Sequence, residues 1–517
     1  MGKKHLLETG EIDENDWEQT PVSVRNLVVK LLDKIERLEK HIKELQETNE
    51  KISEKVNQNS QNSNNPPTSD PLNVEIPKKK KKLGGKKRGG QLGHEGHRRF
   101  LYSEEECKEI IEHYPDSCKC CGEKLTGRDP KPYRHQIVEI PPIVLEIVEH
   151  RLHERVCDNC GEKTRAILPQ EVETSGYGER VVALVSLMSG MYRHSHRMVV
   201  SALSDYFGLK IGLGTVNRLR NQGSEAVARA VEEAKVYVQS QRIVGADETG
   251  FKQGNSDGKN PERKKAWLWV AVTPLVTFFQ VMLARSTEAS QSLLGEKFSG
   301  ILNSDRYHAY NWLDVSQRQL CWAHLKREFT KISERRGVSR QIGRDLLAQQ
   351  KRLFRLWSKV RDGTLSFENF QIAVLPLRER LKKLLQEGAD YPIDHKEKTP
   401  LAHTVRTCRQ LLKMEPALWL FVAVEGLEPT NNAAERAIRP AVLWRKNSFG
   451  SQSEEGSVFV SRMLTVITSL RSQNRDVLEF MTEAVRANRK GTTPPSLLDI
   501  SQMKTLYWQA FAVYLFK

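Results

Sequence analysis

Apolar residues repeat every seven positions near the start of the chain. Val24, Leu31, Leu38, Leu45 and Ile52 occupy one seam position, and Val28, Ile35, Ile42 and Asn49 occupy the other. A mean spacing of 3.5 residues is typical of helices that wind around each other. We therefore predict a coiled coil over residues 20–55 that joins two copies of the chain, with the polar Asn49 fixing the register. The alternative is a single helix that packs on its own domain.

The pattern then changes twice before residue 240. Residues 56–100 are polar, glycine-rich and cationic, which predicts a disordered arm. His135–Ile140 and Ile143–Val156, separated by two prolines, predict the strands of a hairpin within a domain over 101–170. Residues 178–240 have a helical pattern.

Within that helical segment, a helix over Val199–Phe207, a turn at Gly208 and a second helix capped by Thr215 are compatible with a helix-turn-helix. Asn217, Arg218 and Arg220 would then be exposed on the second helix. Any small helical domain produces the same pattern, so base recognition by this element stays an open alternative.

Five short apolar runs rich in β-branched and aromatic residues follow residue 240. They are Arg242–Ala246, Trp267–Val272, Thr277–Leu283, Gly300–Asn303 and Gln319–Ala323, with a helical stretch around Ser286–Phe298 before the fourth. Three strands in succession, a helix and two further strands match the order of a ribonuclease H-like sheet. The helical pattern resumes at His324, so we expect this core over 241–324 and 429–490, a helical insertion over 325–428 between its parts, and a tail over 491–517. The fold class is thus multidomain α/β.

Charge and composition change this picture at one place above all. The 517 residues carry a formal net charge of +16, with 81 Lys and Arg against 65 Asp and Glu. The stretch 78–99 holds ten of these cations and one Glu: Lys78, Lys79, Lys80, Lys81, Lys82, Lys86, Lys87, Arg88, Arg98 and Arg99. Such a basic arm lies along nucleic acid phosphates by charge. The alternative is a solvated linker.

No stretch is long and apolar enough to cross a bilayer, and the first residues lack the apolar segment of a secretion signal. We therefore expect a cytoplasmic protein. Eight cysteines are too few for a disulfide scaffold, but four form two C-x-x-C-G motifs: Cys118, Cys121, Cys157 and Cys160. Zinc prefers four thiolates in a tetrahedron, so the sequence predicts one structural zinc ion.

Three carboxylates are placed as in phosphoryl-transfer enzymes built on this sheet. Asp247 ends the predicted first strand, Asp305 follows the fourth, and Glu435 lies on a helix that Thr430 or Asn431 would cap. Carboxylates are hard oxygen ligands, which favour two magnesium ions, or manganese in their place. Glu248 is the rival ligand, but alternation along a strand points it to the opposite face.

Six ordered motifs resemble transposases of the insertion-sequence-66 family, which are DDE transposases. They are residues 86–91 with 93–99, the paired C-x-x-C-G motifs, 246–249, 304–307, 321–324 and 431–440. The resemblance implies that Asp247, Asp305 and Glu435 form the catalytic triad, and that a helical insertion interrupts the ribonuclease H-like core. It also implies double-stranded DNA as the partner, namely element ends and target DNA, with accessory proteins of the same element and a nucleoid-associated location in a prokaryote.

Further cations and a histidine lie near these motifs. His324 either supports the site or is a core residue at a strand-to-helix corner, and Arg436 and Arg439 either contact phosphate or form a solvated face. Arg306 stands where many relatives are expected to have glycine, which adds a positive charge beside Asp305. The leading hypothesis is a transposase that cleaves and joins DNA. The competing ones are a non-catalytic, zinc-containing DNA-binding protein derived from a transposase, and a ribonuclease H-like nuclease that cleaves without joining.

Overall fold

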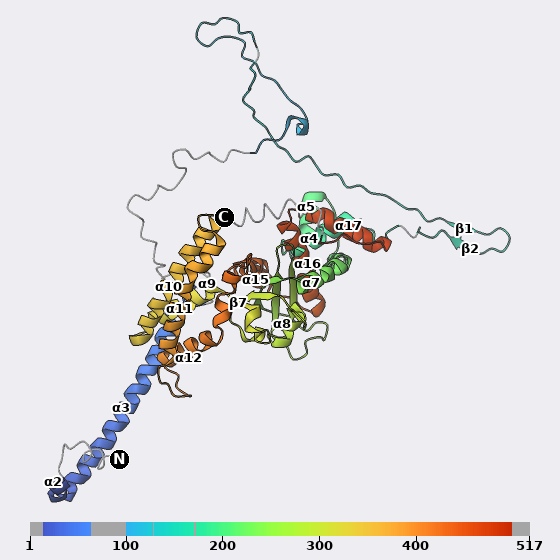
Figure 1. Cartoon of the computed structure of the whole chain (residues 1–517). Helices are drawn as coiled ribbons and strands as arrows, with labels where there is room; N and C mark the ends of the chain where they lie inside the picture. Colours follow the sequence, from blue (N-terminus) through green and yellow to red (C-terminus); the bar gives the residue numbers. More distant parts are fainter. Residues whose placement is uncertain (1–13, 64–99, 128, 170–171, 499–517) are drawn as a thin grey trace.

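The fold is that of a computed structural model, which describes residues 14–63, 100–127, 129–169 and 172–498 (Figure 1). The predicted arm over 78–99 and most of the tail lie outside these residues. No helix within the described ranges is both long and apolar enough to span a membrane.

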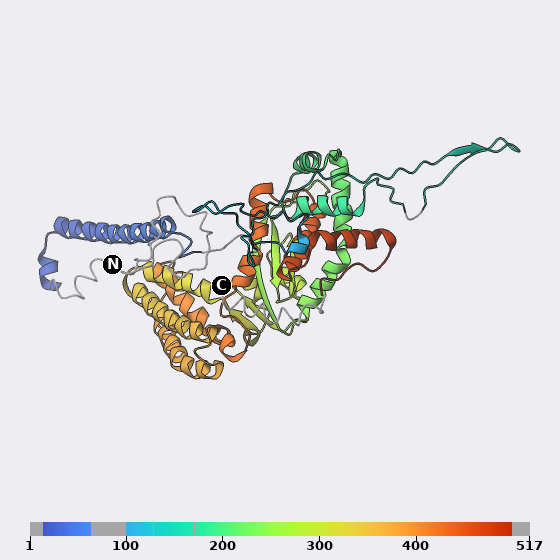
Figure 2. The same cartoon turned by 90° about the horizontal axis from the view of Figure 1, so that it is seen from above.

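A long N-terminal helix confirms the helical part of the heptad prediction. After the short helix α2 (Glu14–Gln19), α3 runs over Val22–Val56 and projects from the body of the molecule (Figures 1 and 2). Its seam residues Leu31, Leu38 and Leu45 are half or more exposed. The far end of α3 docks on the molecule through Glu54, which lies 2.9 Å from Arg335 and 3.8 Å from Lys331.

Residues 100–127 and 129–169 extend away from the body (Figure 1), and the predicted hairpin of His135–Ile140 with Ile143–Val156 is wrong: of these residues only Glu154–Val156 form a strand, β1. β1 pairs antiparallel with β2 (Lys163–Arg165), and the two strands flank the second C-x-x-C-G motif. The described residues of this region also contain the helical turn η2 (Glu104–Glu106) and an antiparallel bridge between Ser117 and Lys124 around the first motif. Ile137, Val144 and Ile147 are more than four-fifths exposed. The apolar residues that predicted a hairpin are therefore not buried against any other described part of the structure.

Four helices precede the sheet and confirm the helical pattern of this region. They are α4 (Glu179–Gly190), α5 (His196–Phe207), α6 (Leu213–Ala226) and α7 (Ala228–Gln239). Gly208 has φ +67° and turns the chain after α5, but Gly212, not Thr215, caps α6. Asn217 and Arg218 are exposed as expected. Arg220 is not, because its guanidinium packs 4.1 Å from the Phe459 ring centroid.

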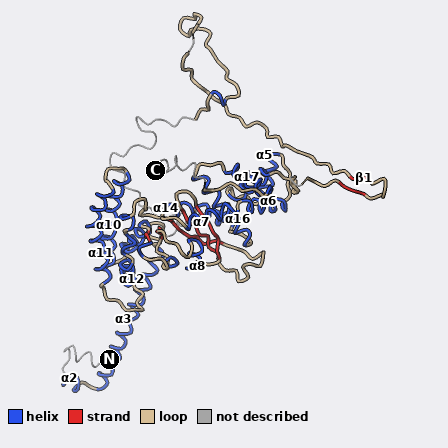
Figure 3. The backbone as a smooth tube through the Cα atoms, turned by 45° about the vertical axis from the view of Figure 1, so that its right-hand side comes forward, coloured by secondary structure: helices blue, strands red, loops and turns tan. Residues whose placement is uncertain are grey.

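The central sheet has five strands in the order β5-β4-β3-β6-β7. Its strands are the red segments in the middle of the molecule in Figure 3. Their bounds are β3 Ile243–Phe251, β4 Ala266–Val272, β5 Thr277–Met282, β6 Ile301–Ser304 and β7 Arg318–Leu320. β3, β4 and β5 are antiparallel, whereas β6 and β7 run parallel to β3. The sheet is thus mixed, and all five predicted strands are present, with helix α8 (Thr287–Leu294) before the fourth.

Two strand ends differ from the prediction. β3 continues to Phe251, so Asp247 lies within the strand rather than at its end, because β4 pairs with it through Gly250 and Phe251. The fifth strand ends at Leu320, so Trp322 and His324 belong to the first turn of α9. Between β6 and β7 the chain forms two short turns, η3 (His308–Tyr310) and η4 (Val315–Gln317).

The edge strand β5 is covered by helix α16 (Glu454–Ser472). Hydroxyls at every fourth residue of α16 accept hydrogen bonds from alternate backbone N–H groups of β5: Ser461 from Val281 at 3.1 Å, Thr465 from Phe279 at 3.0 Å and Ser469 from Thr277 at 3.0 Å. These bonds satisfy the outward N–H groups that an edge strand otherwise exposes.

A helical block separates β7 from the last part of the chain, as predicted. It contains α9 (Trp322–Glu334), α10 (Gly337–Arg361), α11 (Phe367–Ala389), α12 (Pro400–Lys413), η5 (Glu415–Leu418) and α13 (Leu420–Ala423). It has its own apolar core around Trp322, whose Nε1 donates to the Leu418 carbonyl at 2.8 Å. The chain then returns to the sheet with α14 (Asn432–Ala437), α15 (Arg439–Ser448), α16 and α17 (Val477–Lys490).

Candidate active site

Asp247 lies on β3, and Asp305 directly follows the neighbouring parallel strand β6. Gly245 of β3 is in register with Asn303 of β6, and each aspartate follows two residues further along its strand direction. Side chains two residues apart on a strand share a face, and neighbouring strands are about 4.8 Å apart. The Asp305 carboxylate accepts a hydrogen bond from the Tyr307 N–H at 2.8 Å, and that of Asp247 accepts one from the Glu248 N–H at 2.9 Å.

The pKa of Asp247 reflects several neighbouring carboxylates. Burial raises the pKa of Asp247 well above its ordinary value, and repulsion from Glu248, Asp305 and Glu435 raises it further. The hydrogen bond from the Glu248 N–H opposes this only in part. A group of carboxylates that repel one another in this way is the kind of environment that a divalent cation neutralises.

Glu435 is brought to these aspartates by the segment that precedes α14. Asn431 is the N-cap residue, as predicted, but its side chain does not cap the helix; it donates to the Ala246 carbonyl of β3 at 2.6 Å. Asn303 of β6 donates to the Glu428 carbonyl at 2.7 Å. A methyl group at Gly245 would lie 2.9 Å from the Asn431 Oδ1, so glycine permits this close approach.

Helix α9 contacts the Glu435 carboxylate with two side chains. His324 Nδ1 lies 3.4 Å and Arg327 Nη2 3.5 Å from Glu435 Oε1. Burial, then Arg327, lowers the pKa of His324, while Glu435 opposes that shift, so the imidazole is mainly neutral near pH 7. Arg327 was not singled out in the sequence, although its position three residues after His324 places both side chains on one face of a helix.

Among the described residues, the ligand atoms of Cys321, His324 and Glu435 form the group of three that lies within 4.8 Å. Cys321 is buried, and its Sγ accepts from the Asn431 N–H at 3.1 Å. Asp247 and Asp305 are therefore outside this tighter group. The oxygen atoms of the three carboxylates remain the hard ligands that magnesium or manganese prefers. Buried Oδ1 atoms of Asn303 and Asn431 have no hydrogen-bond partner among the described residues.

Glu248 points to the other face of the sheet, as alternation along β3 predicts. Its side chain is 1% exposed and receives hydrogen bonds from Arg285 Nε at 3.0 Å and from the Tyr310 hydroxyl at 2.7 Å. The buried carboxylate thus forms an ion pair with Arg285, whose side chain is 31% exposed. Burial, then Asp305, raises the pKa of Glu248, whereas Arg285 and Tyr310 lower it. Glu248 is therefore committed to packing rather than free to bind an ion.

The predicted cations have different surroundings. Arg306 Nη2 donates to both carboxylate oxygens of Glu328 on α9, at 2.6 and 2.8 Å, so its charge is compensated. Arg445 donates to the Thr249 hydroxyl and the Gly250 carbonyl, which fastens α15 to β3. Arg436 and Arg439 are exposed and lie on either side of the junction between α14 and α15, within four residues of Glu435.

The two C-x-x-C-G motifs fold alike. Cys118 N–H donates to the Glu123 carbonyl and Gly122 N–H to the Cys118 carbonyl, and Cys157, Glu162 and Gly161 repeat this pattern. Gly122 and Gly161 have φ +76° and +73°, which glycine adopts without strain. Backbone hydrogen bonds from Cys121 and Cys120 lower the pKa of Cys118, and those from Cys160 and Asn159 lower that of Cys157.

Each motif therefore presents two thiols in a turn suited to a metal, but the structure does not bring the two pairs together. No group of three among Cys118, Cys121, Cys157 and Cys160 has its sulfur atoms within 4.8 Å of one another. The zinc site stays a prediction. The same holds for the basic arm, which lies outside the described residues.

Comparisons with known proteins place most of the described body of the chain in one family. The family described as "Transposase IS66 family" matches residues 181–458, from α4 into α16, and a "Family of unknown function (DUF6444)" matches residues 12–100. Two proteins of Sinorhizobium fredii (strain NBRC 101917 / NGR234) are similar. Uncharacterized protein y4qI is 28% identical over 253 residues, which are 44% of each chain. Uncharacterized protein y4hP is 22% identical over 407 residues, which are 74% of this chain and 72% of y4hP. The chain thus spans less than half the length of y4qI.

Proposed function

Because the chain belongs to the IS66 family of transposases, we propose that it cuts DNA at the ends of a mobile element and joins the freed 3′ hydroxyl to target DNA. Water and then that hydroxyl would be the successive nucleophiles at one site. Both reactions are phosphoryl transfers, so one set of residues serves them. The observation that supports the proposal is the placement of Asp247 within β3 beside Asp305, which follows the parallel strand β6, with Glu435 of α14 near enough for its charge to raise the pKa of Asp247.

We assign the five-stranded sheet to a ribonuclease H-like core over 241–324 and 429–490, with 325–428 as its helical insertion. In this assignment Asp247, Asp305 and Glu435 hold two divalent ions, magnesium or manganese. Bound ions would activate the attacking oxygen and stabilise the leaving oxygen. Burial raises the pKa of Asp247, and repulsion from Glu248, Asp305 and Glu435 raises it further; this repulsion favours cation binding.

Residues around the triad would orient it and hold the substrate. His324 and Arg327 contact Glu435 and limit the directions its carboxylate can take. Arg436 and Arg439 are exposed beside it, where they can contact DNA phosphates. Arg306 is paired with Glu328 and would act through the position of α9 rather than on DNA.

The N-terminal segments would serve assembly and DNA binding. We propose that the coiled coil over 20–55 joins two copies, that the arm over 78–99 binds DNA by charge, and that Cys118, Cys121, Cys157 and Cys160 hold one structural zinc ion in the 101–170 domain. The 178–240 helices would add contacts to the element ends. Accessory proteins of the same element are further candidate partners.

Asp247→Asn, Asp305→Asn and Glu435→Gln test the proposal, because each keeps the shape of the side chain and removes its charge. We expect each variant to lose end cleavage and strand transfer while retaining DNA binding. Glu288→Gln, an exposed carboxylate on α8, is the matched control and should stay active. Full activity of Asp305→Asn would refute the mechanism. Cleavage without joining by the unaltered protein would instead favour a nuclease.

A further inference from the structure

Helix α10 of the helical block carries a row of cations. Arg340, Arg344, Lys351, Arg352, Arg355 and Lys359 are all exposed. At 100° per residue they fall within about a third of the helix circumference. The buried side chains of α10, among them Ile342, Leu346 and Leu353, occupy the opposite side. We call the six cations the α10 row.

Within the part of the chain that the structure describes, no carboxylate is paired with the α10 row. None of the ion pairs between described residues includes one of its six side chains, whereas other cations of the block are paired, such as Arg335 with Glu54 and Arg378 with Glu415. Arg340 donates only to the backbone carbonyl of Arg335, at 2.9 Å. Asp345 is the one acidic residue within α10, and it accepts from Gln341. Exposed like charges repel, so their alignment destabilises α10 unless a polyanion binds.

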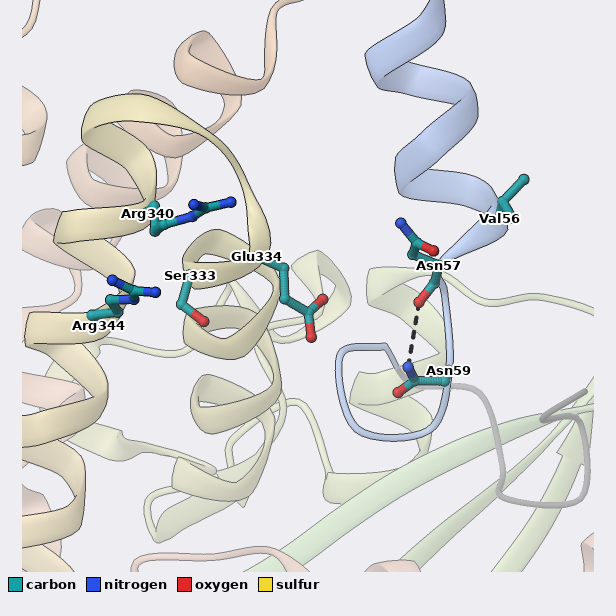
Figure 4. Close-up of a pocket in the computed structure, with 7 residues that line it drawn as sticks. All are labelled: Val56, Asn57, Asn59, Ser333, Glu334, Arg340 and Arg344. Atoms are coloured by element: carbon teal, nitrogen blue, oxygen red, sulfur yellow. Dashed lines mark hydrogen bonds between the residues drawn. The ribbon is translucent and has the colours of Figure 1, made fainter. Parts of the chain in front are cut away.

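Grooves lie along both ends of the row. At the beginning, Arg340 and Arg344 of α10 line a cavity with Val56, the last residue of α3, and Asn57 and Asn59, which follow it (Figure 4). Near the other end, a groove between α10 and α11 is lined by the cations Arg352, Arg355 and Lys359 and by the apolar side chains of Leu356, Ala373 and Leu377. A groove lined by both cations and apolar side chains suits the phosphate and deoxyribose of a nucleic acid backbone.

The dimensions also fit duplex DNA. From Arg340 to Lys359 the helix rises about 28 Å, which corresponds to about eight phosphates of one strand at 3.4 Å each. The far end of α10 lies near the candidate active site, because Phe354 packs on Trp322 with 6.5 Å between ring centroids. Trp322 begins α9, which carries His324 to Glu435.

We propose that the α10 row is a second DNA-binding surface, which holds the phosphate backbone of duplex DNA beside the active site without reading its sequence. The inference rests on the proposed function only in taking DNA as the substrate. It assigns to the helical block a role apart from the arm over 78–99. It also explains why a block without catalytic carboxylates of its own displays an uncompensated row of charge.

Charge removal in the full chain tests this proposal. The triple variant Lys351→Gln, Arg355→Gln and Lys359→Gln is compared with Arg380→Gln, Lys382→Gln and Lys383→Gln, which removes three exposed cations from α11. A labelled 40-base-pair duplex of arbitrary sequence is titrated at several salt concentrations. The α10 variant should bind at least about tenfold more weakly at 50 mM salt, with a log–log slope shallower by about 2.7. The α11 variant should bind like the unaltered protein.

Equal affinity and slope for the α10 variant and the unaltered protein would overturn the proposal, as would equal losses in both variants, which would show an effect of net charge alone. A photoreactive residue at the exposed Ala348, within the row, gives a measurement that needs no charge removal. It should crosslink to the duplex, whereas one at Glu379 of α11 should not. At saturating DNA the α10 variant should still cleave, so a failure of this inference is separable from a failure of the triad variants.

Discussion

Glu435 Oε1 lies 3.4 Å from His324 Nδ1, and the second side chain at this oxygen, Arg327, is on the same helix. The proposed third metal ligand is thus oriented by α9, the helix that links the sheet to the helical block. The contact joins residues 111 positions apart in the sequence. It makes the geometry of the triad depend on a residue that need not touch DNA.

His324→Gln should therefore weaken metal use rather than abolish catalysis. Loss of a side chain that orients a metal ligand typically lowers affinity or activity by about 10- to 100-fold. We expect cleavage by this variant to need more magnesium and to recover at high magnesium concentration. A magnesium titration of the cleavage rate measures this. A rate that falls without any change in the magnesium requirement would instead indicate direct contact of His324 with the substrate.

Asp247→Asn should stabilise the metal-free protein at neutral pH. Because the folded pKa of Asp247 is raised above its unfolded value, the folded state binds the proton more tightly, and this contribution is largest at low pH. It is lost as the pH rises from the unfolded pKa through the folded one. Thermal unfolding with and without magnesium checks this: the ion should raise the midpoint of the unaltered protein and have a smaller effect on the variant.

The ion pair of Glu248 and Arg285 should matter for stability more than for metal binding. Arg285→Met leaves the Glu248 carboxylate without its cation and should cost about 3 kcal/mol of unfolding free energy. Glu248→Gln keeps the Tyr310 contact and should cost less. Urea unfolding of both variants measures the difference. If Glu248→Gln were fully folded yet lacked metal binding, the assignment of the two faces of β3 would be reversed.

Residues 20–55 should form a parallel dimer. Leu38→Lys and Leu45→Lys place charges in the exposed seam of α3 and should weaken association, because apolar seam residues drive it. Sedimentation of the paired variant against the unaltered protein tests this. Glu39→Lys, outside the seam, is the control. If the seam variant had the same oligomeric state as the unaltered protein, α3 would not be the element that joins two copies.

The purified protein should contain about one zinc ion per chain in a site of four thiolates. Cys118→Ser or Cys157→Ser should remove it and loosen residues 115–165, while Cys120→Ser should not. Elemental analysis measures the zinc content, and limited proteolysis measures the loosening. Well-folded protein without zinc would contradict the assignment.

The strands, the helical block and the carboxylate positions were predictable because each depends on local patterns of apolar and polar residues. The length of β3 was not. Its polar stretch Asp247-Glu248-Thr249 reads as a turn, and only Arg285 and Tyr310, distant in the sequence, explain how Glu248 can be buried within a strand.

Two other differences have the same origin. Arg220 was predicted to be exposed on its helix, but it packs on Phe459, which lies 239 positions later in the sequence. Asn431 was expected to cap a helix, yet its side chain binds β3 instead. In both cases the partner comes from a part of the chain that no local pattern connects to it. The α10 row, by contrast, is local and could have been read from the sequence.

The spacing of the hydroxyls along α16 differs slightly from the spacing of the N–H groups along β5. Four helical residues advance about 6.0 Å, whereas two strand residues advance about 6.8 Å. The two spacings differ by about 0.8 Å at each further contact. Short hydroxyl side chains can therefore reach the N–H groups at three successive contacts, and a further contact needs a longer side chain. At the next position the residue is Gln473, whose amide spans the gap to the Leu275 carbonyl at 3.0 Å. A one-residue insertion or deletion inside α16 would rotate the remaining hydroxyls off the strand, so the length of this helix is fixed by the strand it covers.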